Sequence, residues 1–140
     1  MDDCIFCKLA NGIFEAATLY EDDSFRVILD LGPAARGHAL IIPKAHYANI
    51  YELPEALAMK AMALAKHMAS VMTKALECDG FNLVQNNGEA AGQTVFHFHM
   101  HLIPRYKEDQ AEFGWNVGKL TDEVKAEVMD KVRAQLAKTE

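Results

Sequence analysis

The chain has 140 residues, 51% of them hydrophobic, and a formal net charge of −6 at pH 7. That length can bury one substantial core, and the acidic balance argues against a broad nucleic-acid surface while remaining compatible with a small nucleotide held by local donors. Because no apolar run reaches the ~18 residues of a membrane span and no charged-then-apolar leader is present, we expect a soluble, cytoplasmic protein without a membrane or nucleic-acid partner.

Two cysteines stand close together near the N-terminus. Cys4 and Cys7 form a Cys-x-x-Cys pair, and Cys78 is the only other cysteine. Three cysteines do not make a disulfide framework, whereas a close pair in a cytosolic protein indicates a metal or redox site. A zinc ion would need two further ligands. We expect Cys78 to be packed without a further role.

Short apolar or alternating runs, separated by Gly, Pro and Asp, predict strands at residues 18–20, 25–29, 38–43, 81–85 and 95–103. Residues 55–77 are rich in Ala, Met, Leu and Lys, follow Pro54 and precede Asp79-Gly80, which predicts one long helix. We expect its methionines to fill the core: Met59, Met62, Met68 and Met72.

Polar residues mark two loops. Asp30 follows the apolar run 25–29, where a carboxylate can accept from ribose hydroxyls or simply begin an Asx turn. Glycines at 88 and 92 allow backbone N–H groups to approach a phosphate closely. Neighbouring donors could extend such a phosphate cradle, or could be ordinary turn residues: Asn86, Gly92, Gln93 and Thr94.

Three imidazoles alternate with apolar residues in His97-Phe98-His99-Met100-His101. On a strand, alternate side chains share a face, so the three rings would form a row opposite the apolar face. A single histidine is most often a hydrogen-bonded packing residue. Three together put groups of similar pKa side by side, where mutual repulsion penalises the charged state, so packing alone is a poor reason for the cluster. Metal binding and nucleophilic catalysis both use neutral imidazoles in this way.

The segment 121–136 predicts an amphipathic helix. Thr121-Asp122-Glu123 is a helix start signal, and apolar residues follow at steps of four: Val124, Val128, Val132 and Leu136. We expect this helix to dock on the body or on a partner.

The pattern from His97 to Ile103, together with the blocks at 36–46 and 86–95, resembles the histidine triad (HIT) family of nucleotide hydrolases and transferases. The match runs from about Cys4 to Arg105. The resemblance implies an α+β fold: an antiparallel sheet of about five strands with one long helix, a short N-terminal helix and a C-terminal helix. It also implies a single domain over 1–140, with its core at 4–105 and an additional segment at 106–140.

The resemblance implies roles for the histidines and the loops. The middle histidine, His99, would attack the α-phosphorus, with the backbone carbonyl of His97 fixing its tautomer; His101 would donate to the phosphate and His38 would support the triad from behind. Asp30 would bind ribose, and the residues of the phosphate loop at 86–94 would hold the phosphate with His99 and His101.

The resemblance also implies a metal site and partners. Many bacterial members pair such cysteines with two histidines, here His46 and His97, so that Cys4, Cys7, His46 and His97 would form a structural zinc site with no position open to substrate; no catalytic metal is expected. The substrate would be a purine nucleotide, held between apolar walls near Phe6, Leu9, Phe25 and Ile28, with adenosine preferred. A homodimer is implied, and Trp115 could stack on substrate or lie in the dimer contact.

Three functions stay open. The first is an enzyme that cleaves a nucleotide from a phosphoramidate, an adenylate or a dinucleoside polyphosphate. The second is a nucleotide-binding or protein-interaction module with little catalysis, and the third is a zinc-stapled structural module. The intact His99 with its loop favours the enzyme, but the sequence does not choose among the substrates.

Overall fold

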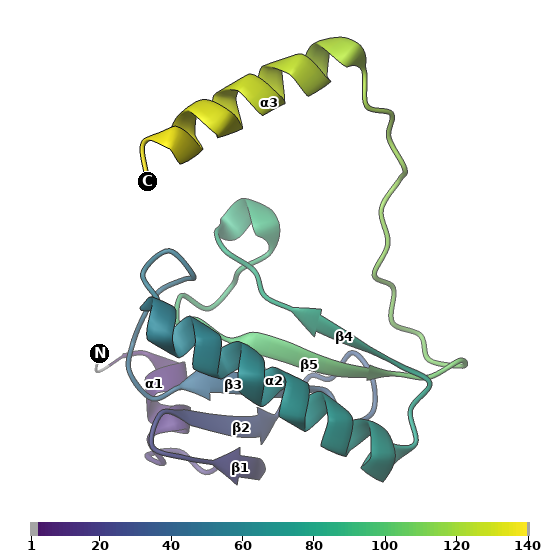
Figure 1. Cartoon of the computed structure of the whole chain (residues 1–140). Helices are drawn as coiled ribbons and strands as arrows, with labels where there is room; N and C mark the ends of the chain where they lie inside the picture. Colours follow the sequence, from purple (N-terminus) through teal and green to yellow (C-terminus); the bar gives the residue numbers. More distant parts are fainter. Residues whose placement is uncertain (1–2, 140) are drawn as a thin grey trace.

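The computed structural model describes residues 3–139 and has an α+β fold. Five strands form one antiparallel sheet in the order β1-β2-β3-β5-β4, and α2 crosses one face of it (Figure 1). The fold class expected from the resemblance is therefore confirmed. The elements are α1 (Ile5–Ala10), β1 (Thr18–Glu21), β2 (Phe25–Leu29), β3 (Ala39–Pro43), α2 (Glu55–Leu76), β4 (Gly80–Val84), the 3-10 turn η1 (Glu89–Ala91), β5 (Met100–Arg105) and α3 (Asp122–Ala137).

The main core lies between α2 and the sheet. Because side chains alternate along a strand, Phe25 and Val27 of β2 point toward α2 while Ile28 points to the other face. From the helix, Met68 and Met72 are buried in this core as expected. The expectation was wrong for Met59 and Met62, which are 71% and 54% exposed, because they lie outside the stripe of α2 that faces the sheet.

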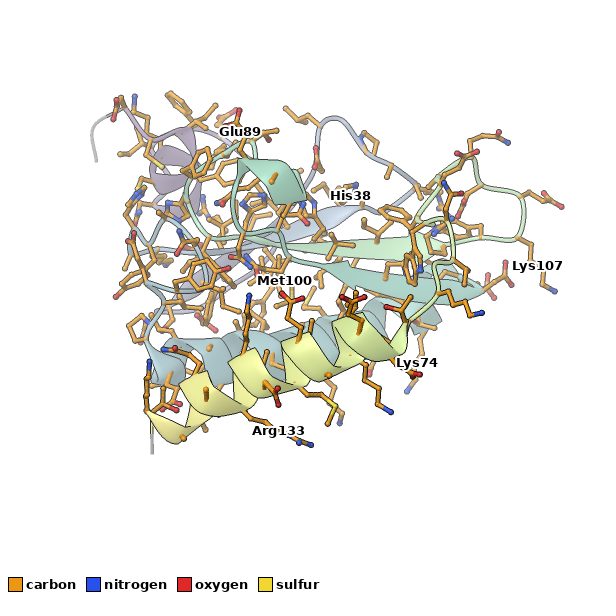
Figure 2. All side chains as sticks on the ribbon, turned by 90° about the horizontal axis from the view of Figure 1, so that it is seen from above. His38, Lys74, Glu89, Met100, Lys107 and Arg133 are labelled. Atoms are coloured by element: carbon orange, nitrogen blue, oxygen red, sulfur yellow. The ribbon has the colours of Figure 1, made fainter. Side chains whose placement is uncertain are left out.

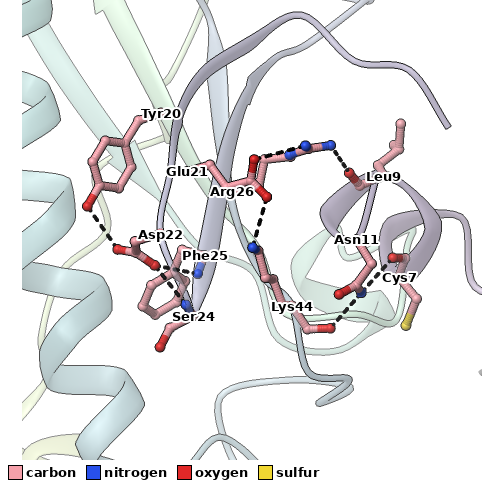
Figure 3. A network of polar contacts seen from close by, with 10 residues as sticks. All are labelled: Cys7, Leu9, Asn11, Tyr20, Glu21, Asp22, Ser24, Phe25, Arg26 and Lys44. Carbon is pink, nitrogen blue, oxygen red and sulfur yellow. Dashed lines mark hydrogen bonds and ion pairs between the residues drawn. The ribbon is translucent and has the colours of Figure 1, made fainter. Parts of the chain in front are cut away.

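The second face of the sheet carries α1. A small apolar cluster of Ala10, Ile28, Leu40 and Ile42 joins the helix to β2 and β3. Polar contacts hold the C-terminal end of α1: Asn11 Nδ2 donates to the Cys7 and Lys44 carbonyls, and an Arg26 N–H donates to the Leu9 carbonyl (Figure 3). This end of α1 is thus fixed to the sheet by hydrogen bonds as well as by packing.

The last strand begins later than the sequence pattern predicts. We expected residues 95–103 to be extended in the sheet, but β5 runs from Met100 to Arg105. The Phe98 N–H donates to the Tyr47 carbonyl at 2.6 Å instead of to a neighbouring strand. Only His101 of the three histidines therefore lies in the sheet, and the predicted row of three rings on one strand is wrong.

The C-terminal segment leaves the sheet after β5. Thr121 caps α3 by accepting from the Val124 N–H, as the start signal predicted. No residue of α3 is buried, and Figure 1 shows the helix set apart from the sheet and α2, although α2 and α3 overlap in the view of Figure 2. The expected docking of this helix on the body is therefore absent among the described residues.

Within residues 3–139, no helix combines the length and the apolar character that crossing a bilayer requires.

Candidate active site and metal-binding cluster

Strand β5 and the segments that precede β3 and β5 bring three histidines to the α1 face. His101 pairs with Leu40 across β3 and β5, and directly opposed residues share a face. His99 precedes β5, and its ring centroid lies 5.0 Å from that of His101. His38, just before β3, is buried behind His101, with its ring centroid 5.1 Å away.

A backbone carbonyl determines which nitrogen of His99 carries the proton. His99 Nδ1 lies 2.8 Å from the His97 carbonyl oxygen, which can only accept a hydrogen bond. Nδ1 therefore carries the hydrogen and Nε2 carries the lone pair. Burial lowers the pKa of His99, against the opposing effects of this hydrogen bond and of Asp30, so the neutral ring predominates near neutral pH.

A backbone N–H determines which nitrogen of His38 carries the proton, and His38 in turn determines it for His101. The Ala34 N–H donates to His38 Nδ1 at 2.9 Å, so neutral His38 carries its hydrogen on Nε2. That nitrogen lies 2.9 Å from His101 Nδ1, to which it donates, and His101 must then carry its own hydrogen on Nε2. Burial, with smaller effects of His99 and His38, lowers the pKa of His101 to about 4. His101 thus presents a neutral N–H donor beside the lone pair of His99.

Asp30 begins an Asx turn, which is one of the two roles that the sequence left open. One carboxylate oxygen accepts from the Gly32 N–H at 2.8 Å, which makes the Asx turn. The other lies 3.6 Å from His38 Nε2. Asp30, His38 and His101 are close enough to hold a cation, but the Ala34 N–H leaves no lone pair on His38 Nε2 for it. The hydrogen-bond pattern therefore favours a hydrogen bond from His38 to His101 over a metal site at these three residues.

A cavity of about 930 Å³ opens beside His99 and His101. Its apolar wall includes Phe6, Leu9 and Ile28, as expected. Phe25 does not reach it, since that ring points into the core under α2 and is 1% exposed. The polar lining includes Asp30, Thr94, His99 and His101.

The structure does not bring three of the loop residues to the cavity wall. Gln93 is 3% exposed, and its amide donates to the Ala48 and Val95 carbonyls while its oxygen accepts from the Gly88 N–H. Both amide hydrogens of Gln93 are thus engaged in holding the loop. Asn86 lies beside Gly92, and neither lines the cavity. Gly88 and Gly92 adopt φ of +94° and +91°, the conformation that favours glycine.

A second cluster joins α1 to the segment before β5. Cys4 Sγ and Cys7 Sγ each lie 3.4 Å from His97 Nδ1, Cys7 Sγ lies 3.4 Å from His46 Nδ1, and the two histidine nitrogens are 3.1 Å apart. Zinc–ligand bonds of ~2.0–2.3 Å in a tetrahedron would separate the ligand atoms by roughly 3.3–3.8 Å. The three sulfur–nitrogen distances fall in this range and the nitrogen–nitrogen distance lies just below it, so the four predicted ligands lie close enough together to hold one metal ion.

The proton positions also suit a cation. His97 Nε2 lies 2.8 Å from the Pro43 carbonyl and donates to it, so Nδ1 presents a lone pair to the cluster. Burial lowers the pKa of His97 to about 4 and raises the pKa of the Cys7 thiol, with Cys4 adding to the latter. Two thiols and two imidazoles are a donor set that zinc prefers.

Sequence reasoning missed three groups that orient the histidine rings or fix their protons. Ala34, Pro43 and the edge-on contact of Phe6 with His99 carry no residue-type signal, because two act through the backbone and the third through packing. Phe6 was expected only as a wall of the cavity.

Comparison with known proteins identifies the family. Residues 12–108 match the HIT domain family. Protein hit of Bacillus subtilis is 38% identical over 137 residues, which cover 98% of this chain and 94% of that protein. Two relatives carry names of activities. Adenylylsulfatase HINT3 of Arabidopsis thaliana is 44% identical over 108 residues, 77% of this chain and 55% of that protein. Adenosine 5′-monophosphoramidase HNT1 of Saccharomyces cerevisiae is 39% identical over 134 residues, 89% and 82% of the two chains.

Comparison with solved structures points to the same family. A HIT family member from Bacillus subtilis has a TM-score of 0.83 at 39% identity, covering 97% of this chain and 96% of that one. A Zn-bound histidine triad family protein from Mycobacterium smegmatis has a TM-score of 0.75 at 34% identity and covers 99% of both chains. The chain therefore belongs to the HIT domain family.

The partly buried His101 ring predicts a pH-dependent stability. Its pKa is about 4 in the fold against 6.5 ordinarily, so between these values the unfolded chain binds a proton that the folded chain does not, and unfolding becomes easier as the pH falls. The slope of the unfolding free energy against pH, measured with urea, reports how many more protons the unfolded chain binds than the folded chain. We expect His101→Gln to reduce that number by up to one across this window. His67→Gln, on the exposed side of α2, is the matched control. Equal pH dependence in His101→Gln and the wild type would contradict the assignment.

Proposed function

We propose that this protein is a nucleotide hydrolase or transferase that cleaves purine nucleotide conjugates at the α-phosphorus. The single observation that carries the proposal is the hydrogen bond from His99 Nδ1 to the His97 carbonyl, which leaves the Nε2 lone pair of a neutral ring beside a nucleotide-sized cavity. Relatives named for adenosine phosphoramidate and adenylylsulfate cleavage support this choice of substrate class. Adenosine 5′-phosphoramidate is the substrate we would place first.

The nucleotide lies along the cavity in this proposal. The purine contacts the apolar wall of Phe6, Leu9 and Ile28. The ribose hydroxyls donate to Asp30, which keeps one carboxylate oxygen free of the Gly32 contact. The phosphate lies against His99, His101 and Thr94, and the loop held by Gln93 closes that end. Asn86 and Gly92 contribute through the shape of the loop.

The reaction follows from the proton positions. His99 Nε2 attacks the α-phosphorus and a nitrogen–phosphorus bond forms. The bond to the leaving group breaks as that group takes a proton from water, so that adenosine 5′-phosphoramidate releases ammonia. His101 donates its Nε2 hydrogen bond to a phosphate oxygen, and His38 keeps that hydrogen in place from behind. Water then hydrolyses the nucleotidyl-His99 intermediate and releases a nucleoside monophosphate.

We propose zinc as the ion for the cluster of Cys4, Cys7, His46 and His97. The spacing and donor set support it, as does the zinc named for the Mycobacterium smegmatis neighbour. All four positions of a tetrahedral ion would be filled by the protein, so bound zinc would supply a structural cross-link and no chemistry to the substrate. Thiols kept available for metal also favour a cytoplasmic location.

The nucleophile is tested by substitution. We expect His99→Ala to lower turnover of adenosine 5′-phosphoramidate by about 10³-fold or more, because the substitution removes the Nε2 lone pair that attacks the phosphorus. His67→Ala, exposed on α2, is the matched control for loss of an imidazole. Product release is measured by chromatography for both variants and the wild type. If the wild type binds adenosine monophosphate but turns nothing over, the protein is a binding module instead.

We also propose a homodimer in which the C-terminal arm, residues 106–139, packs on a second copy. The apolar residues Val124, Val128, Val132 and Leu136 are 48–57% exposed, Trp115 is 85% exposed, and α2 exposes Met59 and Met62. Apolar surface of this extent in one chain is typical of an interface that a partner covers. An arm of this kind could bring Trp115 near the partner's cavity.

The dimer is tested by sedimentation. At micromolar concentration we expect a mass near twice the 15.6 kDa of one chain. Charges on the apolar side of α3, in the double variant V128E and V132E, should weaken association by about tenfold or more, because they would desolvate in the interface. Ala126→Glu, which adds a charge at an exposed position away from the apolar side of α3, is the matched control. A wild-type protein that sediments as a monomer would contradict the proposal.

A further inference from the structure

The short helix α1 serves the metal-binding cluster and the cavity at once. Cys4 caps its N-terminus, where its sulfur accepts from the Cys7 N–H, and both sulfurs face His97. Phe6 and Leu9, on the same six-residue helix, line the cavity beside His99. Any movement of α1 would therefore change both the metal-binding cluster and the wall of the cavity.

Phe6 links the two sites directly. Its ring meets the His99 ring edge-on, with centroids 4.8 Å apart and an interplanar angle of 87°. It also lies 6.2 Å from the His97 ring at 72°. Such edge-to-face contacts have preferred geometries, so a displaced Phe6 would lose them. Phe6 thus stands between a ligand of the cluster and the proposed nucleophile.

The two ends of α1 are held differently. At the C-terminal end, Ala10 is buried and the residues Asn11 and Arg26 supply hydrogen bonds (Figure 3). At the N-terminal end, the two thiols lie 3.4 Å from ring nitrogens of His46 and His97, where an S–H group is only a weak donor. The position of the first turn, which carries Phe6, therefore depends on what the thiols bind.

We infer that metal binding at Cys4, Cys7, His46 and His97 and nucleotide binding in the cavity are coupled through Phe6, so that each ligand raises the affinity for the other. A metal ion that fixes the first turn of α1 holds Phe6 against His99 and preforms the wall on which the base lies. Coupling between two binding equilibria is reciprocal, so bound nucleotide must tighten metal binding by the same factor. The inference rests on the proposed nucleotide site.

The test uses the full-length, zinc-loaded protein. Its affinity for Zn²⁺ is measured by competition with a chromogenic chelator, without nucleotide and with saturating adenosine 5′-monophosphate, whose binding is followed separately by calorimetry. We expect the nucleotide to raise the affinity for Zn²⁺ by about fivefold or more. Phe6→Ala should abolish the increase at nucleotide saturation, Phe6→Tyr should retain it because an aromatic ring remains, and Cys78→Ser, outside the cluster, should behave as the wild type.

The outcomes separate the two claims. If calorimetry detects bound nucleotide and the Zn²⁺ affinity is unchanged, the coupling is wrong while the nucleotide site stands. If the increase persists in Phe6→Ala, the route through Phe6 is wrong. If the zinc-loaded protein binds no adenosine 5′-monophosphate, the proposed nucleotide site itself is overturned.

Discussion

Two backbone groups fix the protons of the imidazole cluster, and the chemistry we propose depends on them. The His97 carbonyl holds the hydrogen of His99 on Nδ1, and the Ala34 N–H holds that of His38 on Nε2. His101 is then oriented by His38. A lone pair and an N–H donor consequently lie side by side, which is what attack at phosphorus and stabilisation of a phosphate oxygen require.

Burial keeps this arrangement neutral. The pKa of each of these three rings is lowered by removal from water, and for His101 the neighbouring rings add to the effect. A protonated His99 would have no lone pair with which to attack. The same apolar surroundings that lower the pKa values, Phe6 and Leu40 among them, also form part of the cavity wall, so packing and reactivity arise from the same residues.

The sequence predicts the sheet, both longer helices and the cluster of histidines, because these follow from alternation, helix composition and a local motif. Prediction from the sequence fails where contacts with other segments of the chain determine the local conformation. Strand β5 starts at Met100 because Phe98 bonds to Tyr47, and Gln93 turns away from the cavity because Ala48 and Val95 accept its hydrogens. The pattern of α2 likewise does not reveal that Met59 lies outside the core.

The fixed tautomers are the central claim, and imidazole nitrogen NMR of the ¹⁵N-labelled protein near neutral pH tests them most directly. Two-bond couplings from ring hydrogens distinguish a protonated nitrogen from one with a lone pair. The account predicts a hydrogen on Nδ1 of His99 and on Nε2 of both His38 and His101. A His99 ring protonated on Nε2, or on both nitrogens, would contradict it, because the lone pair that is to attack phosphorus would be absent.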